Sequence, residues 1–209
     1  MEIDTLEIVD LKISFGELVV LDQFCFTLNR GQSLWIQGAN GSGKSSLLKC
    51  LAGINSYSGT VLVSGHAPTD PKARKLMTYC PDEPALYYDL TLRQHAKFTA
   101  MLASSHDIYK SICELYYYFG IEKYFDQTPI NLSKGTKQKA SLCLTLGMKK
   151  DIIILDEPFN GLDSTSLRKL THLIATYAEE GISMIFTAHQ EIEVIENVKN
   201  IRTITLSSE

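Results

Sequence analysis

The sequence predicts an α/β fold, in which a parallel sheet is covered by helices on both faces and a helical segment is inserted into the sheet. Three observations predict it. Short apolar segments typical of strands dominate up to Cys80, and strand and helix patterns alternate again after Asp151. The stretch between these two parts has helical periodicity alone. Strands that alternate with helices imply a parallel sheet, and 209 residues suffice for one domain with a sizeable core.

The first part of the chain reads as strands with one helix among them. Gly16 separates the first two strands, and the glycine-rich segment 38–43 follows the third strand. The helix that comes next places Leu47, Leu48 and Leu51 on one side. We expect strands over residues 6–13, 19–28, 33–37, 60–63 and 76–80, and a helix over 45–54.

The middle part of the chain predicts helices alone, whereas the last part predicts strands and helices in alternation. Thr91 and Ser105 precede apolar periodic segments as candidate N-caps, and Gly120 follows the second of these helices. We expect helices over 91–103, 105–119, 133–148 and 164–179, a short helix after 187, and strands over 152–155, 183–187 and 201–206. The expected division is a core of residues 1–82 and 146–209 and a helical subdomain of residues 83–145.

The bulk composition excludes several classes of protein. The net charge is −4 and the isoelectric point is about 5.8, so the chain has no overall basic field for nucleic acid or anionic lipid. The five cysteines are scattered without a CxxC pair, which indicates reduced thiols in a cytosolic protein. We expect neither a secretory signal at the acidic N-terminus nor a membrane span anywhere.

The strongest local signal is the segment GANGSGKS at residues 38–45, which matches GxxxxGK[ST] between an expected strand and an expected helix. Glycines let such a loop wrap closely around phosphate, and its backbone N–H groups and the helix N-terminus then face the anion. Lys44 supplies a charge to the phosphates and Ser45 a hydroxyl to Mg²⁺. The candidate nucleotide-binding residues in and beside the loop are Gly38, Asn40, Gly41, Ser42, Gly43, Lys44, Ser45 and Ser46.

A second signal is the run IIILDE at residues 152–157. A buried parallel strand reads as continuous aliphatic residues, and ligands bind beyond the carboxyl ends of such strands. We expect Asp156 to hold Mg²⁺ and Glu157 to act as the general base for an attacking water. Taken alone, the pattern also fits a strand that enters a solvated turn. The phosphate-binding loop upstream favours the catalytic interpretation.

Three further segments complete a family pattern. The segment LSKGTKQ at 132–138 resembles the signature motif of ATP-binding-cassette (ABC) proteins, and GLD at 161–163 resembles their D-loop. His189 resembles their switch histidine. The resemblance spans the chain and implies a P-loop NTPase core with an N-terminal antiparallel β part and an inserted α-helical subdomain. It also implies ATP and Mg²⁺ as cofactors.

The resemblance assigns roles to residues that have simpler explanations on their own. Ser133 and Gly135 would approach the γ-phosphate of a nucleotide bound by a second subunit, although a serine before a helix is commonly only a cap. His189 would hydrogen-bond the γ-phosphate and orient water, although a histidine after a strand is commonly structural. Asp163 of the D-loop is added to the candidate nucleotide site.

Three positions depart from the family pattern. Phe15 stands where an adenine-stacking tyrosine is usual, so it either stacks on the base or packs in the core. Asp82 replaces the usual glutamine of the turn TYCPDEP and could ligate Mg²⁺ or accept a hydrogen bond from water. Lys134 of the signature either faces the partner's nucleotide or solvent. An acid at position 82 also occurs in family members that export antimicrobial peptides.

We therefore expect an ATPase subunit of a transporter, an exporter by analogy at Asp82, that powers a separate transmembrane permease through ATP-driven closure of a dimer. It would lie in the cytoplasm, at the inner face of the membrane, and pair with a second ABC subunit, identical or different, with ATP at the interface. The apolar run 84–88 either docks on the permease or packs within the helical block. The alternative is a soluble, non-transport ABC ATPase such as an assembly-type enzyme.

Overall fold

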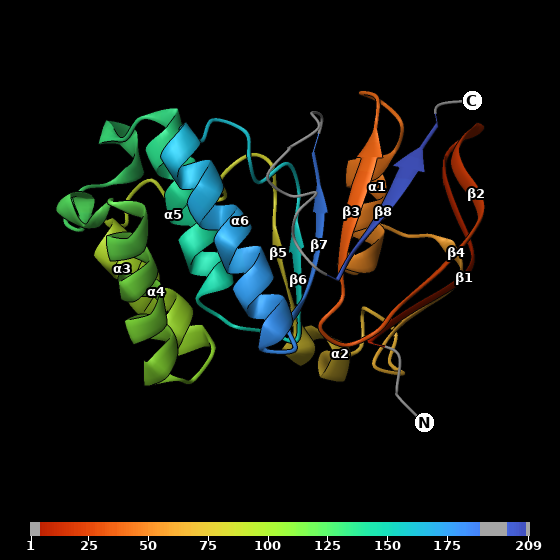
Figure 1. The fold of residues 1–209 in the computed structure, drawn as a ribbon, viewed down its shortest axis with the longest axis horizontal. Helices are drawn as coiled ribbons and strands as arrows, with labels where there is room; N and C mark the ends of the chain where they lie inside the picture. Colours follow the sequence, from red (N-terminus) through yellow and green to blue (C-terminus); the bar gives the residue numbers. More distant parts are fainter. Residues whose placement is uncertain (1–4, 189–199, 208–209) are drawn as a thin grey trace.

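A central sheet of parallel strands organises the molecule, with the order β5-β6-β7-β3-β8 (Figure 1). The computed structural model describes residues 5–188 and 200–207. The parallel sheet confirms the predicted α/β class. Its strands are β3 (Ser33–Gly38), β5 (Met77–Cys80), β6 (Ile152–Leu155), β7 (Ser183–Thr187) and β8 (Ile201–Leu206).

A second, antiparallel sheet lies beside the first and has the order β2-β1-β4 (Figure 1). It confirms the antiparallel β part that the family resemblance implied. Its strands are β1 (Leu6–Phe15), β2 (Leu18–Leu28) and β4 (Ser58–Val63). Each is longer than predicted. β1 and β2 are extended because Gly16 occupies a tight turn at φ 60° and lets the β1–β2 pairing continue to Phe15 and Leu18.

The central strands divide their side chains between two apolar cores. Ile152 and Ile154 of β6 pack with the antiparallel sheet and α1 (Lys44–Leu51), whereas Ile153 and Leu155 face the helices on the other side. β3 and β7 alternate in the same way. Because successive strand residues point to opposite faces, a strand covered on both faces is apolar throughout. This explains the continuous aliphatic run that predicted β6.

The helical block covers the face opposite α1, and every described element between β5 and β6 in the chain is helical (Figure 1). Its first helix is capped as expected: Thr91 accepts from the backbone of Gln94, and Gln94 returns the bond. Gly120 ends the second helix in the left-handed conformation. The helices on this face are α3 (Leu92–Leu102), α4 (His106–Phe119), α5 (Lys134–Leu146) and α6 (Ser164–Glu179), with short 3₁₀ turns at Glu122–Tyr124 and Pro129–Asn131.

One helix was missed in the sequence. α2 (Pro71–Leu76) precedes β5, and Asp70 caps it by accepting from Lys72 N. The signal was the pair Asp70-Pro71, because proline is favoured at the first helical position after an acidic cap. The expectation of a strand over 76–80 was therefore wrong at Leu76, which ends α2. Two predicted features, the short helix after 187 and His189, lie outside the described residues.

Candidate active site

The loop between β3 and α1 follows a path that requires glycine. Gly43 is the N-cap of α1 at φ 90°, and a Cβ there would lie 2.4 Å from Cγ1 of Val20. A Cβ on Gly38 would lie 2.6 Å from the carbonyl oxygen of Leu206. Both distances are far below van der Waals contact. The loop is therefore packed tightly at the start of the helix, with no room for a side chain at these two positions.

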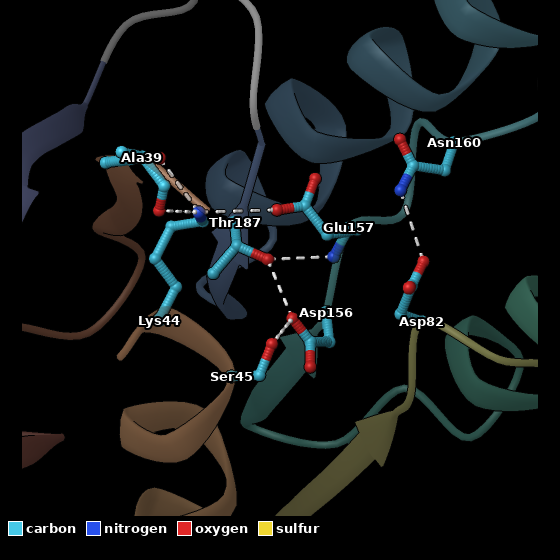
Figure 2. Close-up of polar contacts among 9 residues, drawn as sticks. Ala39, Lys44, Ser45, Asp82, Asp156, Glu157, Asn160 and Thr187 are labelled. Atoms are coloured by element: carbon cyan, nitrogen blue, oxygen red, sulfur yellow. Dashed lines mark hydrogen bonds and ion pairs between the residues drawn. The ribbon is translucent and has the colours of Figure 1, made fainter. Parts of the chain in front are cut away.

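Lys44 begins α1 with its side chain buried. Its Nζ donates to the carbonyl oxygens of Gly38 at 2.8 Å and Ala39 at 3.1 Å (Figure 2). Oε1 of Glu157 lies 3.9 Å from the same nitrogen. The loop cation and the acid after β6 thus meet at one edge of the sheet, although they are 113 residues apart in the chain.

Asp156 follows β6 and is almost fully buried. Its Oδ1 accepts from Ser45 Oγ and from Thr187 Oγ1, each at 3.0 Å, and its Oδ2 accepts from Tyr79 Oη at 3.3 Å. Burial, and then the charge of Asp156, raise the pKa of the Tyr79 phenol, so the phenol remains a donor. Hydroxyls from three separate elements therefore converge on one carboxylate.

Glu157 has a left-handed backbone at φ 47°, which is unusual for a residue with a side chain. Its N–H donates to Thr187 Oγ1 at 2.8 Å, and its carbonyl accepts from Asn160 N at 3.1 Å. The left-handed turn redirects the chain immediately after the strand. It brings the buried Glu157 carboxylate toward Lys44 instead of extending the strand direction (Figure 2).

A cavity of about 380 Å³ joins several of these groups. Phe15 lies at its rim and is about half exposed, so it is not a core residue. The lining residues are Phe15, Val20, Asn40, Gly41, Gly43, Lys44, Ser45, Ser46, Asp82 and Glu157. Gly38 and Ser42 shape the loop behind this lining, where Ser42 N donates to Ala39 O. A larger, apolar hollow between α3 and α4 lies away from these polar groups.

Asp82 reaches this cavity from the turn after β5. Its side chain is exposed, and its Oδ1 accepts from Asn160 Nδ2 at 3.2 Å (Figure 2). Asn160 belongs to the segment that follows Glu157. The turn before the helical block and the segment after β6 are thus linked by a side-chain hydrogen bond. Sequence reasoning did not anticipate this partner for Asp82.

The signature residues lie outside the cavity lining. Ser133 caps α5, accepting from Thr136 N at 3.2 Å, and its side chain is exposed. A Cβ on Gly135 would lie 2.8 Å from the carbonyl oxygen of Gly161. Asp163 caps α6, and its bond to Lys139 at 2.6 Å holds the pKa of its carboxyl well below the ordinary range. None of these three residues lines the cavity beside the loop.

The oxygen donors beside the loop suit a magnesium ion. The Ser45 hydroxyl and the Asp156 carboxylate are in direct contact, and Mg²⁺ prefers such hard oxygen ligands. Within the described residues no group of three or more His, Cys, Asp and Glu side chains could form an all-protein metal site.

Comparison with known proteins identifies the family. A profile described as "ABC transporter" matches residues 21–160. The chain belongs to the ABC transporter family. It is 35% identical over 92% of its length to an uncharacterized ABC transporter ATP-binding protein of Methanocaldococcus jannaschii, of which it covers 71%. A solved ATP-binding subunit of an ABC transporter, 27% identical, matches 97% of this chain and is itself 85% covered, with a TM-score of 0.89.

Two further ABC relatives have names that state a cargo class. The chain is 30% identical to the SkfA peptide export ATP-binding protein SkfE of Bacillus subtilis, over 87% of this chain and 77% of that protein. It is also 30% identical to the lantibiotic transport ATP-binding protein SrtF of Streptococcus pyogenes, over 90% of this chain and 82% of that protein. This ABC chain is accordingly an ATP-binding, ATP-hydrolysing transporter subunit. None of the helices within residues 5–188 and 200–207 could span a membrane.

Proposed function

We propose that this subunit hydrolyses Mg-ATP at the edge of the sheet and thereby powers export of a peptide through a separate membrane permease. The observation that carries the proposal is the convergence of Lys44, Ser45, Asp156 and Glu157 on one cavity edge. The names of the SkfE and SrtF relatives favour a peptide as cargo. They also favour transport over a soluble, assembly-type role. The permease would hold the subunit at the inner face of the membrane.

The chain's own residues divide the chemistry among them. The N–H groups of the loop and the Lys44 ammonium bind the phosphates, and Phe15 at the rim stacks on the base. The remaining proposed loop contacts are Gly38, Asn40, Gly41, Ser42, Gly43 and Ser46. Glu157 accepts a proton from the attacking water, and its burial and nearness to Lys44 orient it toward the phosphate end. His189 is proposed to hydrogen-bond the γ-phosphate.

Ser45 and Asp156 would hold Mg²⁺, with Asp82 as a further ligand or as an acceptor for a bound water. The ion, when bound, neutralises charge that develops on the phosphate oxygens. Asp82 lines the same cavity and presents a carboxyl group where the family commonly has the amide of a glutamine. The bond from Asn160 holds that carboxylate at the cavity wall.

Closure of the nucleotide-binding site requires a second ABC subunit. Ser133, Gly135 and Asp163 do not line the cavity beside the loop, which supports a model in which they contact the nucleotide of the other subunit. A symmetric pair, with each signature surface on the other's nucleotide, completes two sites. ATP then forms part of the interface, and its hydrolysis releases the halves.

The test uses a variant that binds ATP without consuming it. Glu157→Gln should hydrolyse ATP at least a hundredfold more slowly, and with ATP it should elute from a sizing column as a dimer. Adding Ser133→Arg should abolish that dimer, because it places bulk and charge at the joint. Ser56→Arg provides a matched control on an exposed loop after the far end of α1. A Glu157→Gln protein that retains native hydrolysis, or a double variant that still dimerises, would contradict the proposal.

A further inference from the structure

Thr187 is the last residue of β7 and is fully buried. No motif singled it out in the sequence. Its hydroxyl lies between the two acids of the site: it accepts from Glu157 N at 2.8 Å and donates to Asp156 Oδ1 at 3.0 Å (Figure 2). Because the hydroxyl has one hydrogen, these two bonds fix its direction. Two hydrogen bonds in series therefore connect the Glu157 backbone through the Thr187 hydroxyl to the Asp156 carboxylate.

We propose that Thr187 is a positioning residue for ATP hydrolysis, which holds Asp156 and Glu157 in register with each other. The inference rests on the proposed roles of those two acids. Among the hydroxyls that reach Asp156, Ser45 is itself a proposed metal ligand, so its contact belongs to the binding event. Thr187 and Tyr79 come from β7 and β5, the two strands that flank β6. They can orient the carboxylate from both sides.

Thr187 differs from Tyr79 because it also serves Glu157. A left-handed backbone at a residue with a side chain is strained, and such strain persists only where surrounding contacts enforce it. The bond from Glu157 N to Thr187 satisfies a buried donor at this turn. Without the hydroxyl that donor loses its partner in β7, so the turn that aims Glu157 would relax. One side chain thereby sets both the metal ligand and the base.

Strand β7 leads directly to Ala188, and the chain then continues to His189. Thr187 therefore joins the end of β6 to the end of β7 by side-chain bonds, where the backbone ladder between these strands stops at the pair Leu155 and Phe186. The link extends the sheet's rigidity by one residue beyond the ladder. Rigid support of this kind is what catalytic groups need, since small displacements of reacting groups cost large factors in rate.

The experiment compares Thr187→Val, which keeps the branched shape and removes the hydroxyl, with Thr187→Ser, which keeps the hydroxyl. Thr171→Val is the matched control, because Thr171 is also buried but its hydroxyl bonds the Leu167 carbonyl within α6. Four quantities are measured on the full chain. They are kcat and KM for Mg-ATP, ATP affinity in EDTA, and the affinity for Mn²⁺ as a spectroscopic probe with ATP present in a Glu157→Gln background.

Thr187→Val should weaken Mn²⁺ binding about tenfold and lower kcat ten- to a hundredfold, with KM and metal-free ATP affinity changed less than about threefold. Thr187→Ser should stay within about threefold of the native protein in all four quantities, and Thr171→Val should behave in the same way. If Thr187→Val does not fold, Thr187→Ala tests the same loss. Native kcat and native Mn²⁺ affinity in a folded hydroxyl-free variant would overturn the inference.

The outcome separates this inference from the proposed function. Glu157→Gln and Asp156→Asn are assayed in parallel, and both should lose hydrolysis if the acids have the roles given above. Loss in these variants together with a native Thr187→Val protein refutes only the role of Thr187. Retained hydrolysis in them refutes the proposed function itself.

Discussion

Replacing Gly135 by alanine tests how closely α5 approaches the segment after β6. Two effects oppose each other. Alanine is favoured over glycine in a helix by about 1 kcal/mol. The added Cβ, however, would lie 2.8 Å from the Gly161 carbonyl oxygen, which is a backbone atom with little freedom to move. Overpacking of this kind typically costs about 1–3 kcal/mol.

The contact should outweigh the propensity, because Gly135 lies in the first turn of α5, where helix propensity contributes less than in the interior. We expect a net loss of about 1 kcal/mol in the free energy of unfolding, which corresponds to a fall of about 2–4 °C in Tm for a chain of this size. Lys134→Ala, one residue earlier and exposed, should stay within about 0.5 kcal/mol of the native protein.

Urea unfolding followed by circular dichroism measures both variants against the native chain, with the slope m checked for constancy. If Gly135→Ala is as stable as the native protein or more stable, then the gain in helix propensity equals or exceeds the steric cost of the added Cβ. The close approach of α5 to Gly161 would then be easily relaxed, and the argument for glycine at this position would fail.

Two further predictions concern pH. His95 accepts a hydrogen bond from Tyr87 N through Nε2, and burial lowers the pKa of its imidazole. The stability that the neutral imidazole contributes is therefore present above the ordinary pKa of 6.5 and is lost as the pH falls below that value. The difference in unfolding free energy between native protein and His95→Gln should therefore shrink from pH 7.5 to pH 5.5, and parallel pH profiles would contradict this. Asp163→Asn keeps the helix cap and loses the bond to Lys139, whereas Asp163→Ala loses both, so the alanine variant should be about 1 kcal/mol less stable than the asparagine variant. Lys139 lowers the pKa of Asp163, so the gap in unfolding free energy between native protein and Asp163→Asn, a few tenths of a kcal/mol for this half-exposed pair, should begin to narrow as the pH falls below the ordinary 3.8. Urea midpoints at pH 7 and pH 3 check it.

Local patterns predicted most of the fold. The aliphatic run of β6 and the cap at Thr91 were readable because each depends on neighbouring residues in the chain. Helix α2 was missed, since six residues give no helical period, although Asp70-Pro71 marked its start. The extension of β1 to Phe15 depends on pairing with β2, which is a tertiary property.

The site residues that belong to a sequence motif could be predicted, whereas contacts between residues outside the motifs could not. Lys44, Ser45, Asp156 and Glu157 meet at the expected edge because the carboxyl ends of parallel strands coincide. Thr187 was not predicted, because a threonine at a strand end has no motif and its partners lie 30 and 31 residues away. The bond between Asp82 and Asn160 was hidden for the same reason.

Because alternate residues of β6 pack in two different cores, the same substitution at neighbouring positions disturbs different parts of the molecule. Shortening Ile153 or Ile154 to valine removes the same methylene, and each change should cost about 0.5–1.5 kcal/mol. The first leaves its void beneath the helical block, whereas the second leaves it against α1, the helix that begins at the phosphate-binding loop. Substitutions at two adjacent positions of one strand can thus change the packing of each core independently. A valine at one position or the other would therefore loosen the packing under the helices on one face or the packing against α1, at a similar cost in overall stability.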